Sequence, residues 1–416
     1  MKLLVVHNAY QQRGGEDAVV DSEIALLRAH GHSVSEYRRD NREIDGDAPM
    51  SRAALAMDTL WSRRTTREVG ALLREQRPDI VHVHNTFPLI SPSVYSCVAR
   101  AGVSGVPIVP IVPIVQTLHN FRLACPQAMF LRDGRVCEDC LGRVPWRGVL
   151  HACYRASTAQ SAVAAASLQL HRVLGSGQRH VARWIALSEF SRGKFLQAGL
   201  PAERMVVLGQ FVESPRTLAG HEPATGPAPA RSGLLFVGRL APEKGLAVLA
   251  QAVTLARATR PSLSVDLIGD GPEQASLQGV AGLRLLGARA PAEVMAAMQR
   301  ATAVLLPSLS YENFPRTLVE AFACGTPVIA SRLGALAELV VHGRTGWHVD
   351  AGDAGALAQA LLRADDEDHA GELAAMGHAA RAEYEARYTP ALHHAALMSI
   401  YAAARDELRG LQGRSR

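Results

Sequence analysis

Residues 308–330 have the sequence SLSYENFPRTLVEAFACGTPVIA. This segment begins just after the apolar run Ala303–Leu306, and it ends with a second apolar run, Pro327–Ala330. The residues from Pro315 onward predict a helix between the two runs, because proline suits the first helical position. A strand, a helix and another strand in succession form a βαβ unit, which requires a parallel sheet. Because parallel α/β sheets bind ligands beyond the carboxyl ends of their strands, the loop around Glu312 is a candidate site.

The same alternation extends over the whole chain of 416 residues. In the second half it predicts strands at Leu234–Val237, Ser264–Ile268, Leu283–Leu286, Ala303–Leu306 and Pro327–Ala330. In the first half it predicts strands at Leu3–Val6, Ser33–Tyr37 and Ile80–Val83, with helices at Glu16–Ala29 and in the stretch that ends at Gln76. We therefore expect an α/β protein with two doubly wound, Rossmann-like domains.

The boundaries of these domains follow from composition. A loop rich in proline, glycine and alanine predicts an interdomain linker at residues 216–232. The domains then cover residues 1–215 and 233–390, and residues 391–416 predict a C-terminal helix that packs back on the first domain. A further irregularity is Val106–Ile114, which repeats the triplet Val-Pro-Ile three times. Because proline cannot donate to a β-ladder, at most one copy should lie in the sheet.

Composition and charge limit the function classes. Apolar residues make up 48% and charged residues 20% of the chain, which excludes a disordered or fibrous protein. The apolar start Leu3–Val6 is too short for a signal peptide, and no run of about 18 apolar residues occurs, which favours a cytoplasmic protein. Residues 1–215 carry 25 Lys and Arg against 19 Asp and Glu, whereas residues 216–416 carry 19 against 20. This excess is compatible with an ordinary solvated surface, or with an acidic partner such as a phosphorylated acceptor or an anionic membrane.

One predicted helix offers a route to such a membrane. Around its axis the arginines Arg63, Arg67 and Arg74 lie opposite an apolar face formed by Trp61, Val69, Leu72 and Leu73. Either the apolar face packs on the sheet while the arginines are merely solvated, or the arginines dock this domain on an acidic membrane at the inner face of the cell.

Two loops of the second half carry charges suited to a diphosphate. Gly238, Arg239 and Lys244 lie between a strand and a helix, where both cations could reach a phosphate. The amides around Pro315 should point outward from a helix N-terminus, which is an anion site. Glu312 and Glu320 are unsuited to phosphate but can accept hydrogen bonds from sugar and ribose hydroxyls.

In this order, Gly14-Gly15-Glu16, Gly238-Arg239 with Lys244, and Glu312-x7-Glu320 followed by Gly325-Thr-Pro-Val resemble the retaining GT-B glycosyltransferases of family four over nearly the whole chain. The resemblance implies that the second domain binds a nucleotide diphosphate sugar and that the two domains face each other across a cleft. It further implies that Arg239 and Lys244 bind the diphosphate, that Glu312 contacts the sugar and that Glu320 contacts the ribose. The donor-binding residues expected are Gly14, Gly15, Gly238, Arg239, Lys244, Glu312, Asn313, Phe314, Pro315 and Glu320.

The resemblance also assigns a histidine and a reaction. His119, in Gln116-Thr-Leu-His-Asn120, is similar to the active-site histidine of the family, so the catalytic residues expected are His119, Arg239, Lys244 and Glu312. The implied reaction is hexosyl transfer with retention of configuration and without a catalytic metal, in bacterial polysaccharide or glycolipid biosynthesis, to a glycan or lipid-linked acceptor. A GT-B sugar-nucleotide epimerase is the alternative enzyme, although the segment from Glu312 to Glu320 argues against it.

Four of the six cysteines cluster within an insertion at about residues 122–154. The close pair Cys137 and Cys140 has the Cys-x2-Cys spacing of a zinc site, and Cys125 and Cys153 complete four ligands. Structural zinc, reduced thiols and disulfides are the three alternatives, of which a reducing compartment disfavours the last. A zinc-stabilised module that binds nucleic acid is the alternative outside enzymes. Aromatic residues at 5% of the chain disfavour it, and no nucleic-acid partner is expected.

Overall fold

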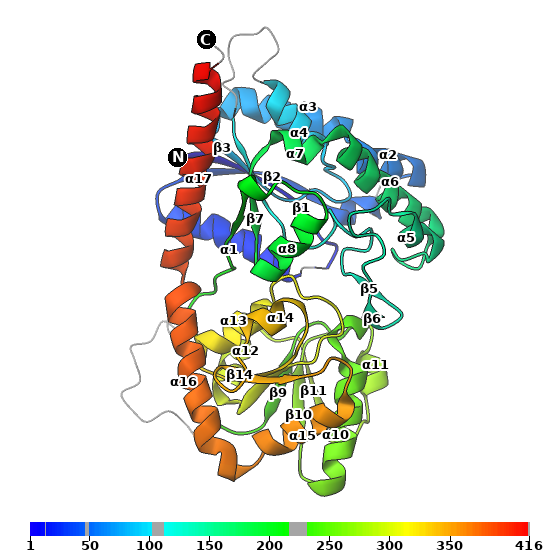
Figure 1. Cartoon of the computed structure of the whole chain (residues 1–416), viewed down its shortest axis with the longest axis vertical. Helices are drawn as coiled ribbons and strands as arrows, with labels where there is room; N and C mark the ends of the chain where they lie inside the picture. The colour runs from blue at the N-terminus through cyan, green and yellow to red at the C-terminus, as the bar shows by residue number, and fades with distance from the viewer. Residues whose placement is uncertain (13, 46–49, 102–111, 216–230, 415–416) are drawn as a thin grey trace. The chain divides into compact units, whose positions relative to one another are not determined.

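The computed structural model describes residues 1–12, 14–45, 50–101, 112–215 and 231–414. They form two compact units (Figure 1). The first unit comprises residues 1–129, 138–208 and 394–416, and the second comprises 130–137 and 209–393. Most of the predicted linker, residues 216–230, lies outside the described residues. None of the helices that are described combines the length and the apolar character needed to cross a bilayer.

The first unit contains a six-stranded sheet with the order β2-β1-β3-β4-β7-β8, and every neighbouring pair is parallel. Its strands are β1 (Lys2–Ala9), β2 (Ser33–Asp40), β3 (Ile80–Asn85), β4 (Ile114–Thr117), β7 (Val181–Ala186) and β8 (Met205–Val207). β1 is buried from its second residue onward and β3 along its whole length. This burial explains why the central strands are continuous apolar runs rather than alternating patterns.

The helices of this unit are α1 (Gly15–Ala29), α2 (Arg52–Leu60), α3 (Arg63–Gln76), α4 (Ser93–Ala101), α5 (Trp146–Leu150), α6 (Thr158–Leu174), α7 (Ser176–His180) and α8 (Glu189–Gln197). Their ends follow local chemistry. Ser157 caps the first turn of α6 through its hydroxyl, and Gly175 ends that helix in the left-handed conformation. In α3, Val69 and Leu73 are buried while Arg63, Arg67 and Arg74 are exposed. The apolar face of α3 is therefore packed inside the domain.

The second unit contains another parallel sheet, with the order β11-β10-β9-β12-β13-β14. Its strands are β9 (Leu234–Val237), β10 (Val265–Ile268), β11 (Leu283–Gly287), β12 (Ala303–Leu306), β13 (Val328–Ser331) and β14 (Gly346–Val349). Numbered along the chain this is the strand order 3-2-1-4-5-6 of a Rossmann fold, so the strand order reverses between β9 and β12 although all strands stay parallel. The prediction of two Rossmann-like parallel sheets is confirmed.

The helices of the second unit are α10 (Leu246–Thr259), α11 (Gln274–Leu277), α12 (Pro291–Arg300), α13 (Arg316–Ala323), α14 (Gly334–Leu339), α15 (Ala354–Ala364) and α16 (Ala370–Arg387). Pro315 is the N-cap of α13 rather than its first residue, a difference of one position that is ordinary at helix ends. β13 begins at Val328, one residue later than expected, because Pro327 has no amide to donate to the ladder.

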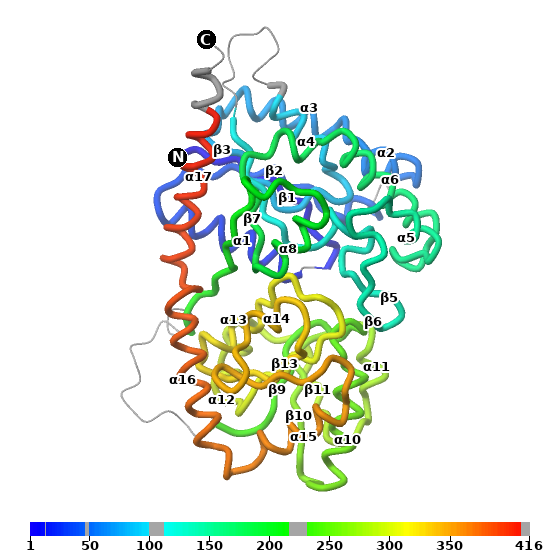
Figure 2. The backbone as a smooth tube through the Cα atoms, viewed as in Figure 1, coloured from blue at the N-terminus to red at the C-terminus, as the bar shows by residue number. Residues whose placement is uncertain are grey.

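The last helix, α17 (Pro390–Arg414), supplies part of the first core. Leu397, Tyr401 and Ala404 are buried against residues of the first sheet and of α1, among them Leu3 and Leu27. Figure 2 shows this helix running beside β3 and β7. The first domain is therefore completed by a segment from the far end of the chain.

Two irregular segments differ from regular βαβ units. The first two Val-Pro-Ile triplets, residues 106–111, lie outside the described residues, and the third enters the sheet where β4 begins at Ile114. Inside the cysteine-rich insertion, β5 (Leu131–Arg132) and β6 (Arg135–Val136) pair antiparallel in a short hairpin. This hairpin belongs to the second unit, whereas the sequence assigned the whole insertion to the first domain.

Candidate functional site

In the second domain, the loops after β9 and β12 touch each other at the point where the strand order reverses. A Cβ atom on Gly245 would lie 2.0 Å from the carbonyl oxygen of Pro307, and Gly245 has a φ of 72°. The amide of Leu309 donates to the carbonyl of Glu243 at 2.9 Å. Only glycine allows so close an approach of two backbones, and the approach places Lys244 beside the loop that carries Glu312.

Lys244, Ser308 and Glu312 form the polar centre of this site. The Nζ of Lys244 lies 2.6 Å from Oε1 of Glu312, and the Oγ of Ser308 donates to the same oxygen at 2.7 Å. Burial by itself would raise the pKa of Glu312. The charge and hydrogen bond of Lys244, together with the Ser308 hydroxyl, outweigh burial and hold that pKa below its ordinary value. The carboxylate is therefore ionised and held in one position.

The other charged residues predicted for this site have separate partners. Arg239 pairs with Glu243, and its side chain is 57% exposed, so it can turn toward a ligand. The Nε of Arg316 donates to Oε1 of Glu320 at 2.8 Å. Arg316 is thus a cation near the predicted ribose site that sequence reasoning missed, although its spacing of four residues before Glu320 is a recognisable helical pair.

The remaining predicted residues of the segment have structural surroundings. The ring of Phe314 is 8% exposed, and its centroid lies 5.8 Å from that of Tyr388. A Cβ atom on Gly209 would lie 3.0 Å from the Phe314 ring. Asn313 and Pro315 are also buried. The structure therefore uses Phe314 as packing that supports the loop. Gly238, with a φ of 157°, directly follows β9, and its carbonyl oxygen would lie 2.0 Å from a Cβ on Gly269.

In the first domain, His119 follows β4 and contacts a histidine of β3. Its Nε2 lies 2.8 Å from Nδ1 of His84. Burial lowers the pKa of His119 well below its ordinary value, and repulsion from His84 and His7 adds to this effect. Burial likewise lowers the pKa of His84 to about 4, and His82 adds to this. Both rings are therefore neutral at pH 7, so His119 can exchange hydrogen bonds with hydroxyl groups rather than contribute a charge.

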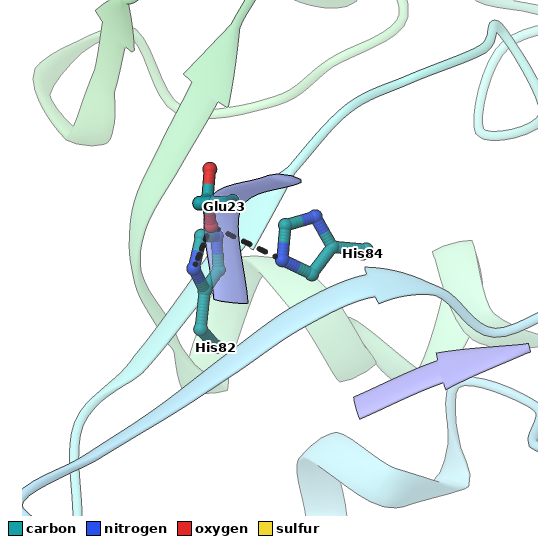
Figure 3. Close-up of side chains that lie close together, drawn as sticks. All are labelled: Glu23, His82 and His84. Carbon is teal, nitrogen blue, oxygen red and sulfur yellow. Dashed lines mark ion pairs between the residues drawn. The ribbon is translucent and has the colours of Figure 1, made fainter. Parts of the chain in front are cut away.

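Behind these rings lies Glu23 of α1, which points toward both histidines of β3 (Figure 3). Its Oε1 is 3.1 Å from Nδ1 of His82 and 3.4 Å from Nε2 of His84. The hydroxyl of Tyr401 in α17 also lies 2.7 Å from Nδ1 of His82. All of these residues are buried. Sequence reasoning missed this cluster, whose local signal is the alternating His-Val-His of β3.

The loop after β1 and the first turn of α1 complete the first-domain site. Gly14 is the N-cap of α1, and its amide donates to Oδ2 of Asp17 at 2.9 Å. Among the described residues, leaving aside chain neighbours and the backbone of the same helix, no atom would lie within 4 Å of a Cβ on Gly14 or Gly15. The Oε2 of Glu16 accepts hydrogen bonds from the hydroxyl of Tyr10 at 2.9 Å and from Nδ2 of Asn120 at 3.2 Å. Burial raises the pKa of Glu16 despite these bonds and the nearby His7.

Two groups of residues bear on metal binding. Within the described parts of the chain, the one set of three or more His, Cys, Asp and Glu ligand atoms within 4.8 Å of one another is Glu23, His82 and His84. Separations of 3.1 and 3.4 Å suit neighbouring ligands of a small cation at about 2.1 Å, and they suit an ion-paired network equally well. Cys125, Cys137, Cys140 and Cys153 form no disulfide, and zinc binding by these four residues stays a prediction.

Both the sequence and the structure of this chain resemble those of known proteins. Residues 14–210 match the family model described as glycosyl transferase 4-like domain, and residues 231–366 match glycosyl transferases group 1. The glycogen synthase of Mycobacterium tuberculosis is 35% identical over 161 residues, which are 37% of this chain and 38% of the relative. The amylovoran biosynthesis glycosyltransferase AmsK of Erwinia amylovora is 29% identical over 233 residues, 52% of this chain and 55% of the relative. The matched part of the chain thus spans about two fifths of the length of the first relative and just over half of the length of the second.

Solved structures resemble the whole chain. HepE of Anabaena, solved in complex with UDP, has a TM-score of 0.62 at 20% identity, with coverage of 97% of this chain and 100% of HepE. Sucrose-phosphate synthase of Thermosynechococcus elongatus has a TM-score of 0.64 at 16% identity, with both chains fully covered. At these identities the likeness concerns the fold.

Proposed function

We propose that this chain, which has the GT-B fold and carries two domains similar to those of glycosyl transferases, moves a sugar from a nucleotide diphosphate sugar to a glycan or lipid-linked acceptor. The observation that carries the proposal is the cluster of Lys244, Ser308 and Glu312 between the carboxyl ends of β9 and β12. A parallel sheet binds its ligand at this point of reversal. The paired charges there have the chemistry for phosphate and for sugar hydroxyls.

The donor would occupy the second domain. Lys244 and the exposed Arg239 would bind the diphosphate, and Glu312 would accept hydrogen bonds from the sugar. Glu320, together with its partner Arg316, would contact the ribose. The amides at the start of α13 add a partial positive charge near the same phosphates. The UDP bound by HepE supports a uridine nucleotide as the first donor to try.

The resemblance to retaining GT-B glycosyltransferases supports the following reaction. The bond between the anomeric carbon and the diphosphate oxygen breaks while the acceptor hydroxyl oxygen bonds to that carbon from the same face, so configuration is retained. The acceptor proton passes to the departing phosphate. Lys244 and Arg239 stabilise the negative charge that develops on the diphosphate, and no step requires a metal ion. Neutral His119 would exchange a hydrogen bond with the hexosyl group.

The acceptor would bind to the first domain. Gly14 and Gly15 leave open space at the start of α1, where a phosphate or hydroxyl could approach the backbone. The exposed Arg63, Arg67 and Arg74 of α3 would hold the domain weakly at the inner, cytoplasmic face of an anionic membrane. Because Val69 and Leu73 of α3 are buried, this helix would contribute mainly charge. A role in bacterial polysaccharide or glycolipid synthesis agrees with AmsK as a relative.

A donor screen tests the proposal. Thermal unfolding is measured with UDP-, GDP- and dTDP-sugars, because a ligand at 100 times its dissociation constant stabilises a protein by about 2.7 kcal/mol. We expect one nucleotide to stabilise the chain and its sugar to be slowly hydrolysed. Conversion of the donor to its epimer would instead identify an epimerase, and the absence of stabilisation by every nucleotide sugar would refute donor binding.

A further inference from the structure

An apolar face is exposed on the first domain where α5 meets α6. Ten large apolar side chains are exposed in the described chain, and six of them fall between residues 144 and 174. Their exposed fractions range from 37% to 69%. We call this face the α5–α6 surface, and its members are Val144, Trp146, Leu150, Leu170, Val173 and Leu174.

These residues form one surface rather than scattered exceptions. α5 and α6 pack against each other and lie side by side (Figure 1). The Nη1 of Arg172, in the last turn of α6, donates to the carbonyl of Arg143 at 2.7 Å. This bond joins the chain next to Val144 to the helix turn next to Val173. On its other side α5 is packed, because a Cβ atom on Gly148 would lie 3.1 Å from Pro126. The contacts of α5 with α6 and with Pro126 therefore fix the position of the exposed face.

The stretch of chain that forms this surface carries charge of one sign. Residues 140–188 contain no Asp or Glu and six arginines, at positions 143, 147, 155, 172, 179 and 183. Acidic side chains from outside this stretch pair with two of them: Asp139 with Arg147 at 3.3 Å, and Glu407 with Arg183. Arg143, Arg155 and Arg179 are exposed. An apolar face with a cationic border is the result.

We propose that the α5–α6 surface docks on an anionic lipid bilayer, with Trp146 and Leu150 inserted at the boundary between headgroups and acyl chains. Charge complementarity favours this occupant, because anionic headgroups would meet the arginines while the apolar side chains leave water. A second copy of the chain is disfavoured as the occupant, because a symmetric dimer through this surface would bring its arginines close to those of the partner. A nucleic acid would find one exposed aromatic ring, Trp146, and would leave the aliphatic side chains in water. Tryptophan is also the residue that membrane interfaces prefer.

This inference differs from docking by α3, whose apolar residues Val69 and Leu73 are buried. It deepens the acceptor side of the proposed function, since a lipid-linked acceptor lies at such a membrane. Vesicle binding is measured without sugar transfer, whereas hydrolysis of the donor is measured without vesicles. A protein that does not bind vesicles could therefore still hydrolyse the donor, and a protein that does not hydrolyse the donor could still bind vesicles.

The experiment is flotation of the full chain with vesicles of phosphatidylcholine alone or mixed with phosphatidylglycerol, at low and high salt. Binding to the mixed vesicles alone, reduced by salt, is expected. Changing Trp146 and Leu150 together to Ser should weaken binding at least about tenfold. Changing Arg143 and Arg147 to Gln should weaken it by about fivefold for each arginine. All of these side chains are exposed, so the thermal unfolding temperature should stay close to that of the wild type.

Two control variants make the result specific. Leu255→Ser with Val341→Ser removes exposed apolar side chains of the second domain and should bind as wild type does. The triple change of Arg63, Arg67 and Arg74 to Gln compares the two surfaces, because it removes the weak attraction proposed for α3, and it should weaken binding less than the double change of Trp146 and Leu150 to Ser. Loss in this triple variant alone would overturn the proposal in favour of α3. Equal binding to neutral vesicles, or concentration-dependent dimers that disappear with Trp146→Ser, would overturn it as well.

Discussion

At the scale of single residues, the ion pair of Lys244 with Glu312 carries the proposed chemistry. Lys244→Ala removes a cation that is 28% exposed, that pairs with Glu312 and that we propose binds the diphosphate. We expect turnover to fall by about 10² to 10³, as when one donor of an oxyanion site is deleted, and Arg239→Ala to act similarly. Steady-state kinetics measure the effect. Lys2→Ala, at an exposed position of β1, is the control, and wild-type turnover in both site variants would contradict the assignment.

The buried histidines give a pH prediction. The pKa of His84 is lowered to about 4, so the folded chain binds fewer protons than the unfolded chain between that pH and about 6.5. Stability is therefore full above about pH 6.5 and falls as pH decreases toward 4, by on the order of 3 kcal/mol from this residue. Urea unfolding across this range should show a smaller decline for His84→Gln. The exposed His151→Gln should keep the wild-type slope. Identical slopes for the wild type and His84→Gln would refute the prediction.

At the scale of elements, α17 completes the core of the first domain. Tyr401 is 0% exposed and reaches His82 with its hydroxyl. Tyr401→Ala should lower the free energy of unfolding by about 3 to 5 kcal/mol, since it leaves a cavity, whereas Tyr401→Phe should cost about 1 kcal/mol. Denaturant unfolding measures both. Leu392→Ala, earlier in the same helix and 44% exposed, should have little effect. Similar losses at both positions would mean that helix propensity rather than packing matters.

At the scale of the whole molecule, the cysteine-rich insertion and the donor site should act independently. Purified protein is expected to hold about one equivalent of zinc, and Cys137→Ser should lose it, because a structural site needs all four ligands. Stabilisation by the nucleotide sugar should persist, since the Lys244 cluster lies elsewhere. Metal analysis and thermal unfolding test both parts, with Cys97→Ser as the control. Zinc that persists in Cys137→Ser and is lost after changing His82 would move the metal to the buried cluster of Glu23, His82 and His84.

The sequence by itself determined the parallel sheets and the position of the candidate loops. Leu234–Val237 and Ala303–Leu306 coincide with β9 and β12, because strands buried on both faces are short apolar runs that local sequence reveals. The loops that follow them were therefore located without any knowledge of their partners.

Only the tertiary structure decided which side chains meet. Lys244 and Glu312 are 68 positions apart, and their contact depends on the reversal between β9 and β12. Tyr401 and His82 are 319 positions apart, and their bond depends on the return of α17 to the first core. No short pattern encodes strand order or the docking of a distant helix. Strand order and helix docking arise because whole apolar faces of helices and sheets are buried against one another. The same packing leaves the apolar side chains of the α5–α6 surface exposed.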